Sequence, residues 1–451
     1  MKSLMLFTIC LPLLIMPCGC ATHIPKVVES TGLPGKNMVQ ANAIVSPTDN
    51  LSSKIEIDSL SLEEAVNIAI QYNPELKSVG KDIDAASARI IQAKLLPNPE
   101  LGFETEDGPA KSLGFGQGYK SIFSLTQPIP LGGKISARTG LAEKEHEIIL
   151  LNYEQKLREV LAEVKKAFTN ILIDRELVRI GDDNLNIARE LFEATKSRVA
   201  AQAAPETEQL KSEIALSGAE ITLNNARTEL AQAQRQLKTL LGNIDIQIKD
   251  YRGVIRDTEP GLAPDKIEGI ILDSYPALLS ARKSIEAAKT QLQLSYAERY
   301  PDITIGLSSG KVRERNEDSN IIEWAVGIPL PVFDRNQGRI KESEALIAKS
   351  EKEYENITNQ VRLETAQTLA LFDNLLNQVQ TYKEKVVPQA EKTLALISEG
   401  YQAGKFTYLE LLDAQRTLTE TREIYLRLLH DLNGSVVDIE RLTGKSIDEL
   451  K

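Results

Sequence analysis

The residues from which catalytic and metal-binding sites are built are scarce in this sequence. All three cysteines lie within the first twenty residues, the chain has three histidines, and Met38 is the only methionine after residue 16. Cys-x-x-Cys and His-x-x-x-His spacings are absent, so no metal centre is indicated. The glycine-rich stretch 114–118 precedes no predicted helix, which argues against a phosphate-binding loop. We therefore expect no enzymatic activity, no cofactor and no resident metal.

Aromatic residues and positive charge are also limited. Aromatics make up 5% of the chain, with a single Trp, whereas Ala, Leu, Glu, Gln and Lys form long runs. That composition is typical of elongated helices rather than of one thick core. The formal net charge is −11, and no basic stripe is interleaved with aromatics, which argues against a nucleic-acid partner.

The N-terminus has the layout of an export signal. A lysine precedes an apolar stretch over residues 4–16, and Cys20 follows shortly after. The stretch is too short for a transmembrane helix. Residues 1–20 are therefore predicted to be a lipoprotein-like signal peptide, with Cys20 as the lipidated N-terminus. Simple cleavage near Ala21 is the alternative, and either reading predicts export from the cytoplasm.

A large part of the sequence is repeated at a spacing of 202 residues. Pro74 recurs as Pro276, and Gly242 recurs as Gly444. A register held over so long a stretch indicates two structural repeats, neither of which can bury its pattern alone. The predicted segments are an extended linker (21–58), a first repeat (59–245), a connector (246–262), a second repeat (263–445) and a C-terminal tail (446–451).

Helical periodicity dominates both repeats. Ser61 and Glu64 predict a capping box at the first helix. Residues 216–240 and 418–442 have the spacing of coiled-coil seams. The other helices are predicted at about 62–72, 74–96, 135–200, 263–274, 276–300 and 340–402.

Turns and interruptions punctuate the long helices. Turns at 202–205 and 404–407 should fold each long helix back on its partner. We expect the first turn to be shaped differently, because Gln202 stands where the second repeat has Gly404. Interruptions are predicted near 181–184 and near Pro388.

Four segments alternate between apolar and polar residues, as half-buried strands do. They lie at about 99–107, 119–128, 301–309 and 321–329, with loops predicted at 107–118 and 309–320. Their length approaches that of transmembrane strands, which must form a closed barrel because every backbone group in lipid has to be paired. Four strands cannot close, so several chains must contribute. The alternatives are a soluble sheet packed on helices, or a periplasmic coiled-coil spacer without a pore.

Ordered motifs along the chain resemble the outer-membrane factor family of the TolC type, most closely its heavy-metal cation efflux branch. The resemblance covers residues 60–445. The motifs are Leu-Pro-Asn-Pro-Glu-Leu at 96–101, Gln-Pro-Ile-Pro-Leu-Gly-Gly-Lys at 127–134, Ile-Pro-Leu-Pro-Val-Phe-Asp-Arg-Asn at 328–336, Gly-Tyr-Gln-Ala-Gly at 400–404 and Leu-Glu-Leu-Leu-Asp-Ala-Gln at 409–415.

The resemblance implies a mainly α-helical tandem-repeat protomer with four strands per chain. Three chains would form a twelve-stranded transmembrane β-barrel, continued by a helical coiled-coil barrel across the periplasm. It implies a non-catalytic exit duct in the outer membrane of a Gram-negative bacterium. The implied partners are a periplasmic adaptor, also called a membrane fusion protein, and a proton-driven inner-membrane resistance-nodulation-division transporter. The expected cargo is heavy-metal cations, with multidrug or protein export as the alternative.

Two groups of functional residues are predicted. The resemblance assigns Glu410 and Asp413 to acidic pore rings and Tyr401 to a latch, with Glu208 and Lys211 at the equivalent positions of the first repeat. The bland alternative is that these are solvated helix positions. Phe406 departs from relatives with a cation there, so the latch contacts carry over poorly. The residues predicted to face lipid are Phe103, Phe123, Leu125, Ile303, Ile305, Trp324 and Val326.

Overall fold

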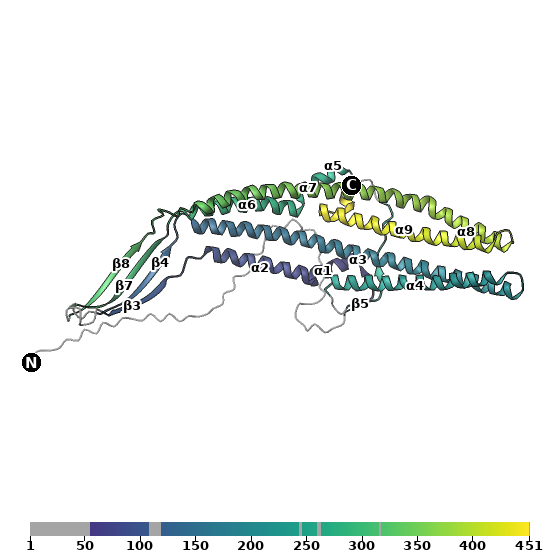
Figure 1. Ribbon diagram of the computed structural model, residues 1–451, viewed down its shortest axis with the longest axis horizontal. Helices are drawn as coiled ribbons and strands as arrows, with labels where there is room; N and C mark the ends of the chain where they lie inside the picture. The colour runs from purple at the N-terminus through teal and green to yellow at the C-terminus, as the bar shows by residue number, and fades with distance from the viewer. Residues whose placement is uncertain (1–54, 108–118, 243–245, 259–262, 315–316, 451) are drawn as a thin grey trace, which may run out of the picture. The chain divides into compact units, whose positions relative to one another are not determined.

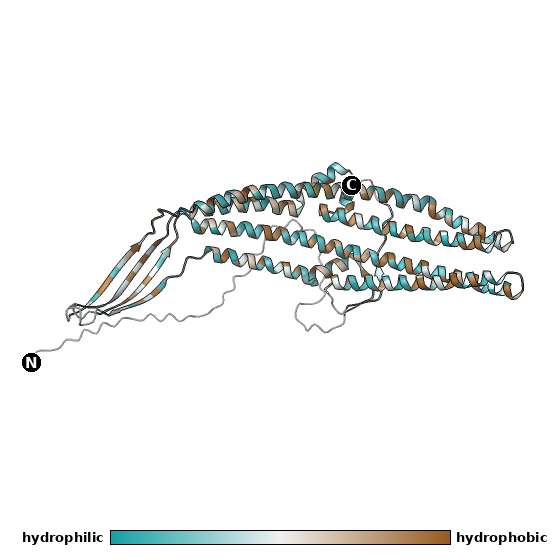
Figure 2. Cartoon of the chain, in the orientation of Figure 1, coloured by the Kyte–Doolittle hydropathy of each residue, from teal (hydrophilic) through white to brown (hydrophobic). Residues whose placement is uncertain are grey.

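The computed structural model describes residues 55–107, 119–242, 246–258, 263–314 and 317–450 (Figure 1). The predicted signal peptide with Cys20, most of the predicted linker, and the loop 108–118 lie outside these residues. Among the residues that are described, no helix is long and apolar enough to cross a membrane. Figure 2 shows hydrophilic and hydrophobic residues intermingled along the helices.

The two halves of the chain contain the same elements in the same order. The first half contains α1 (Leu62–Tyr72), α2 (Pro74–Lys94), β3 (Glu100–Asp107), β4 (Tyr119–Ile129), α3 (Lys134–Ala200) and α4 (Glu206–Leu240). The second half contains α5 (Pro264–Ser274), α6 (Pro276–Ala297), β7 (Ile303–Glu314), β8 (Glu317–Gly327), α7 (Gln337–Thr381), a π-helical turn η2 (Tyr382–Val386), α8 (Val387–Gln402) and α9 (Tyr408–Thr443). The predicted duplication is therefore a structural repeat.

Local chemistry explains where the first helices begin. Ser61 and Glu64 form the predicted capping box, in which the Ser61 backbone N–H donates to the Glu64 carboxylate at 2.8 Å. Asn73 separates α1 from α2: its side-chain oxygen accepts from Glu75 N, while its amide donates to the Leu240 carbonyl. One residue thus caps α2 and ties it to the end of α4.

Each half has its own buried core. Phe168 on α3 lies at the centre of the first core, with residues of α1, α2 and α4 around it. Phe372 on α7 has the matching place in the second core, among residues of α5, α6 and α9. Both phenylalanine side chains are among the largest that are fully buried. Burying such a side chain contributes roughly 2–3 kcal/mol, and Ile173 and Ile180 of α3 extend the second core into the first half.

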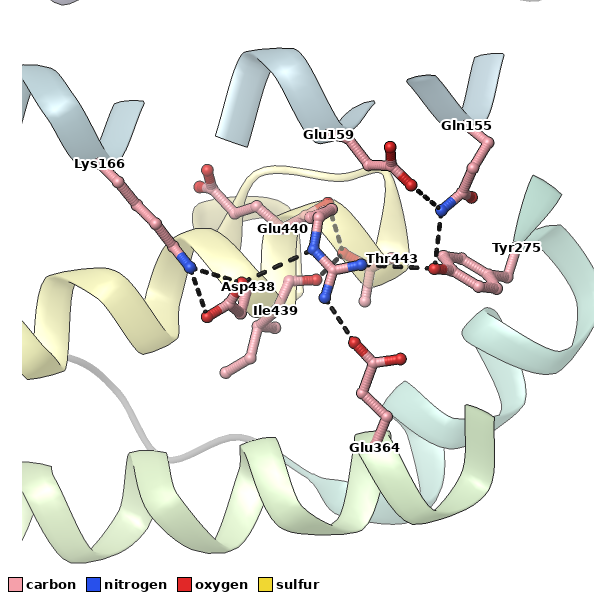
Figure 3. Close-up of polar contacts among 10 residues, drawn as sticks. Gln155, Glu159, Lys166, Tyr275, Glu364, Asp438, Ile439, Glu440 and Thr443 are labelled. Atoms are coloured by element: carbon pink, nitrogen blue, oxygen red, sulfur yellow. Dashed lines mark hydrogen bonds and ion pairs between the residues drawn. The ribbon is translucent and has the colours of Figure 1, made fainter. Parts of the chain in front are cut away.

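The helix α3 also packs against the other half. Its Lys165 pairs with Glu440 at 2.6 Å, and its Lys166 pairs with Asp438 at 2.8 Å, both on α9. Figure 3 shows this junction, where Lys166 reaches Asp438 and Gln155 reaches Tyr275. The junction between the halves is therefore mixed: these ion pairs link α3 to α9, while Ile173 and Ile180 of α3 are buried in the second core.

Short elements replace parts of the predicted linker, connector and tail. In the linker's last residues, β1 (Ile55–Ile57) pairs in parallel with β5 (Ile246–Ile248). A second parallel pair joins β2 (Leu60–Ser61) to β6 (Tyr251–Arg252). The tail contains a 3-10 turn, η3 (Ile447–Glu449), whose Ile447 is fully buried in the second core. These segments have no regular hydrophobic pattern, so the sequence alone did not predict the few residues in them that pair or pack against the rest of the chain.

The four longer strands form one antiparallel sheet in the order β3-β4-β7-β8. The loop predicted at 309–320 is wrong, because β7 continues to Glu314 and β8 begins at Glu317. Arg313 and Asp318 are opposite each other there and form an ion pair of 2.5 Å. Charged residues on both strands interrupt the alternation, so the pattern was misread as a loop.

The long helices differ from the prediction at one of the two expected interruptions. Near Pro388 the chain does form a π turn, in which Val387 N–H donates to Tyr382 O, since proline cannot donate within a regular helix. The interruption predicted at 181–184 is wrong, because α3 is continuous. Gly181 is buried instead, and a Cβ added there would come 3.3 Å from Leu223 on α4. This glycine permits close helix packing rather than breaking the helix.

The two mid-helix glycines Gly181 and Gly218 provide a matched test of this reading. Gly181→Leu should lower the free energy of unfolding by roughly 1–3 kcal/mol, because the side chain must displace Leu223. Gly218→Leu should raise it by up to about 1 kcal/mol, because no atom lies within 4 Å of the added Cβ and leucine favours helix. Thermal unfolding in detergent measures both. Equal shifts in the two variants would contradict a packing role for Gly181.

Candidate functional site

One face of the four-stranded sheet is apolar and exposed. Leu125, Leu307 and Trp324 lie directly opposite one another on β4, β7 and β8 and form one row across this face. The Trp324 side chain is 80% exposed, although tryptophan is usually buried. All the residues predicted to face lipid lie on this face: Phe103, Phe123, Leu125, Ile303, Ile305, Trp324 and Val326.

The opposite face of the sheet carries small and acidic residues. Gly102, Ser124 and Ser308 form one row, which continues to Glu323 on β8. Glu104 begins the next row, beside Ile122. The sheet thus has one apolar face and one polar face, as the wall between lipid and water requires.

The turns at the far ends of the long helices have the same backbone geometry. Gln202 has a φ of 58° and Gly404 a φ of 72°, and each turn closes with equivalent hydrogen bonds. Ala203 N–H donates to Arg198 O in the first turn, as Lys405 N–H donates to Gly400 O in the second. The expected difference in shape is therefore wrong: Gln202 adopts the left-handed conformation that glycine adopts more easily.

Tyr401, the predicted latch, joins the two hairpins of the chain. Its hydroxyl accepts a 2.5 Å hydrogen bond from Arg198 on α3, whose guanidinium also lies 5.3 Å from the tyrosine ring centre. A cation of the first hairpin thus contacts Tyr401 of the second. Phe406 instead packs against Gly400, where a Cβ would collide with its ring.

Glu410 has a local structural role. Its carboxylate accepts from the Thr407 backbone N–H at 2.7 Å and from the Thr407 hydroxyl at 2.8 Å, which completes a capping box on α9. These bonds lower the pKa of Glu410. Asp413 lies exposed one turn further along α9. Glu410 and Asp413 therefore share a helix face, as their spacing predicts.

The equivalent residues of the first hairpin are in a different environment. Lys211 is exposed, whereas one carboxylate oxygen of Glu208 is buried and has no hydrogen-bond partner among the described residues. The neighbouring Tyr408 is 4% exposed. Burial raises the pKa of Tyr408, a hydrogen bond with Ser212 opposes this, and the Glu208 charge adds a smaller increase. Tyr408 lines a cavity of about 380 Å³ between the hairpins.

Arg198 and Tyr408 are tip residues that sequence reasoning missed. Arg198 stands where the second repeat has Gly400, and Tyr408 stands where the first repeat has Glu206. These differences between the repeats could have identified both residues from the sequence. Equivalent positions with equivalent neighbours can keep the same residue, whereas Arg198 and Tyr408 each contact the other hairpin.

A half-buried carboxyl group lies further along the hairpins. Burial raises the pKa of Asp174 on α3 to about 6, Glu229 on α4 adds to this, and His430 on α9 opposes it. Burial likewise raises the pKa of Glu423 on α9. Acidic residues of three helices therefore face one another between the hairpins.

Known proteins are similar to this chain in sequence and in architecture. The family model described as outer membrane efflux protein matches residues 65–243 and 269–445. The chain is 31% identical over 390 residues to the cobalt-zinc-cadmium resistance protein CzcC of Cupriavidus metallidurans, a match that covers 86% of this chain and 90% of that protein. It is 26% identical over 245 residues to the probable outer membrane lipoprotein SilC of Salmonella typhimurium, about half of each chain (52%). A crystal structure of CusC matches with a TM-score of 0.72 at 18% identity, covering 85% of this chain and 91% of that one.

These matches confirm the resemblance seen in the motifs. The two matched segments of the family model fall in the two structural repeats. The chain belongs to the outer membrane efflux protein family. It is an efflux channel protein of the outer membrane and not an enzyme.

The raised pKa of Asp174 predicts a pH-dependent stability. A carboxyl whose pKa is higher in the folded state stabilises the fold when protonated, so stability falls as the pH rises from 3.8 through about 6. Asp174→Asn should therefore raise the free energy of unfolding at pH 7.5 by about 1–2 kcal/mol after allowance for solvent screening, and change it little at pH 3.5. Thermal unfolding at both pH values measures this. An equal gain at both would show that the carboxyl charge is not the cause.

Proposed function

We propose that three copies of this chain form one exit duct for heavy-metal cations, with a twelve-stranded barrel in the outer membrane and a helical barrel in the periplasm. The observation that carries the proposal is the four-stranded sheet. Its apolar face is exposed, and β3 and β8 are edge strands. Edge strands cannot remain unpaired in lipid, and known barrels use eight or more strands.

Strand direction supports closure by further copies. Each strand is antiparallel to its neighbour, so β3 and β7 run one way and β4 and β8 the other. If β8 of one copy pairs with β3 of the next, that pair is antiparallel as well, and the alternation continues around the ring. Three copies supply twelve strands, an even number as closure of an antiparallel barrel requires.

The helical parts support a continuous wall below the barrel. α3 and α7 follow directly from β4 and β8, and each carries its chain away from the sheet (Figure 1). The partners implied by the family resemblance are a periplasmic adaptor and a proton-driven inner-membrane transporter of the resistance-nodulation-division class. We place the hairpin tips at the end that meets them.

Two observations favour cations as cargo. The relative CzcC is named for resistance to cobalt, zinc and cadmium. The polar face of the sheet carries Glu100, Glu104 and Glu323, which in a closed barrel would line the lumen and concentrate cations. The helices supply no cysteine or methionine ligands, so we assign metal selection to the transporter and adaptor.

Deletion of the gene tests the cargo. The deletion strain should become sensitive to zinc, cobalt or cadmium salts, and complementation should restore growth. Sensitivity to organic dyes and antibiotics without metal sensitivity would instead identify a multidrug duct. Loss of one secreted protein with unchanged resistance would identify a secretion duct.

The two faces of β8 allow a matched test of the barrel. Trp324→Arg should prevent assembly of SDS-resistant oligomers, because arginine on the lipid face costs roughly 2–4 kcal/mol near the middle of the bilayer. Ala325→Arg, one residue away on the polar face, should assemble normally. Normal assembly of both variants would refute the proposed lipid face.

We propose a gate at the hairpin tips. In a trimer, Glu410 and Asp413 would form two acidic rings about one turn apart, with Tyr401 and Arg198 holding the hairpins together. The exposed Asp413 and the capping Glu410 both leave a negative charge at this end of α9. Glu208 and Lys211 on α4 would lie at the same level on the neighbouring hairpin.

Isosteric substitutions test the gate without breaking the helix cap. Glu410→Gln with Asp413→Asn should weaken block by trivalent cations in planar bilayers roughly tenfold, since glutamine still caps α9. Tyr401→Phe should raise the resting conductance by removing the acceptor of the Arg198 hydrogen bond. Glu399→Gln, which neutralises an exposed carboxylate on α8, is the control. If that control weakens the block as much as the double variant, the gate is assigned to the wrong residues.

We also propose that Cys20 is lipidated, as the name of the relative SilC suggests for that protein. Cys20→Ser should then abolish labelling with radioactive palmitate. Persistent labelling would contradict this assignment.

A further inference from the structure

Arg158, in the first half of the chain, contacts the C-terminal ends of both α5 and α9 in the second half. Gly444 caps α9 with a φ of 70°, and a Cβ added there would come 2.6 Å from the Arg158 guanidinium carbon. Arg158, on α3, also donates to the carbonyl of Ser274, the last residue of α5, at 3.4 Å. Helix C-termini carry partial negative charge, so this guanidinium stabilises both ends.

The first half has the same pair of helix ends. Gly242, after α4, has a φ of 98°, and a Cβ added there would come 2.6 Å from the carbonyl oxygen of Tyr72, the last residue of α1. Tyr72 and Gly242 precede Ser274 and Gly444 by the 202-residue repeat spacing. At Gly242, however, the three nearest atoms all belong to Tyr72, where Gly444 has a guanidinium.

The counterpart of Arg158 in the second half is Arg362. The buried cores set the register of α7 on α3: Phe168 matches Phe372, and Ile171 matches Leu375, each 204 residues apart. The same spacing takes Arg158 to Arg362. Arg362 is exposed on α7 and pairs at 3.4 Å with Glu268 of its own half.

We propose that Arg362 of one copy covers the ends of α1 and α4 of a second copy, as Arg158 covers those of α5 and α9 within its chain. This inference rests on the ring assembly proposed above. Within the chain, α3 of the first half packs on α6 and α9 of the second. In a ring, the equivalent contact places α7 against α2 and α4 of the next copy.

A cluster of charges on the same helices supports this placement independently. On α3 and α6, Lys144 lies 3.0 Å from Glu286, and Lys283 lies 2.9 Å from Glu147, so the two helices are linked across the halves. The repeat spacing takes Lys283 and Glu286 to Lys81 and Asp84 on α2, whose side chains are 81% and 69% exposed. In the 204-residue register, Glu147 corresponds to Glu351 on α7, and Lys349 lies one residue from the counterpart of Lys144, so a second copy would bring charges of both signs to Lys81 and Asp84.

Cross-linking tests the register of this interface. Ala162 and Arg441 line one cavity of about 150 Å³ beneath Arg158, and their counterparts are Ala366 and Thr239. The chain has no cysteine after Cys20, so Ala366→Cys with Thr239→Cys gives a defined pair. A short bis-maleimide should link this pair between chains in the detergent-purified protein. Ala366→Cys with Gln232→Cys, two turns or about 10 Å further along α4, should not be linked.

Each outcome of the cross-linking bears on a different step. A trimer by mass photometry that shows no linkage, or equal linkage of both pairs, would overturn the Arg362 interface while leaving the duct intact. A protein that is monomeric in mild detergent would overturn the ring and this inference together.

Substitution of the arginine tests whether it acts between chains. Arg362→Ala should lower the fraction of SDS-resistant trimer severalfold at the wild-type midpoint temperature, and Arg362→Lys should restore part of it, because lysine also favours helix C-termini. Glu268→Gln removes the partner of Arg362 within its own chain and should leave trimer resistance unchanged. If Glu268→Gln lowers trimer resistance as much as Arg362→Ala, the arginine acts within its own chain and the proposal is wrong.

Discussion

The packing of α3 against both halves is the contact on which the rest of the chain depends. α3 fills the first core through Phe168 and also reaches α9 through Lys165, whose partner Glu440 is only 12% exposed. Losing one member of so poorly solvated a pair would leave the other charge without compensation, which is costly. The same helix continues from β4 and fixes where the sheet begins. The two halves of the sheet and the two hairpins are thereby held to one register.

The sequence repeat accounts for the helices and strands that the two halves have in common. The positions at which the repeats differ account for the contacts at the hairpin tips. Positions that match at 202 residues build equivalent turns and glycine helix ends in the two halves, and the phenylalanines of the two cores match at 204 residues. Arg198 and Tyr408 break that match, and both contact the opposite hairpin. Two different surfaces contact each other through different residues. Positions at which the two repeats differ in sequence therefore mark where the repeats acquired different roles. Arg158 and Arg362 illustrate the reverse case, in which equal residues imply equal neighbours.

Periodicity predicted helices, strands and turns well, but it could not weigh local packing. The capping box at Ser61 and the turn at Gly404 follow from local chemistry, and both are present. Gly181 was misread because glycine breaks a helix in isolation, whereas here it admits Leu223. The extension of β7 to Glu314 was missed because charged residues, including the cross-strand pair Arg313–Asp318, replace apolar alternation there. Glu410 was identified by resemblance alone, which could not reveal that its carboxylate turns back to cap α9.

The division of the buried residues has a consequence for biogenesis. The first core uses only residues before Arg252, so it can form while the second half is still crossing the inner membrane. The sheet cannot form at that stage, because β4 pairs with β7, which lies in the second half of the sequence. N-terminal units generally fold first during synthesis. The first helical hairpin can therefore fold in water before the complete four-stranded sheet can form.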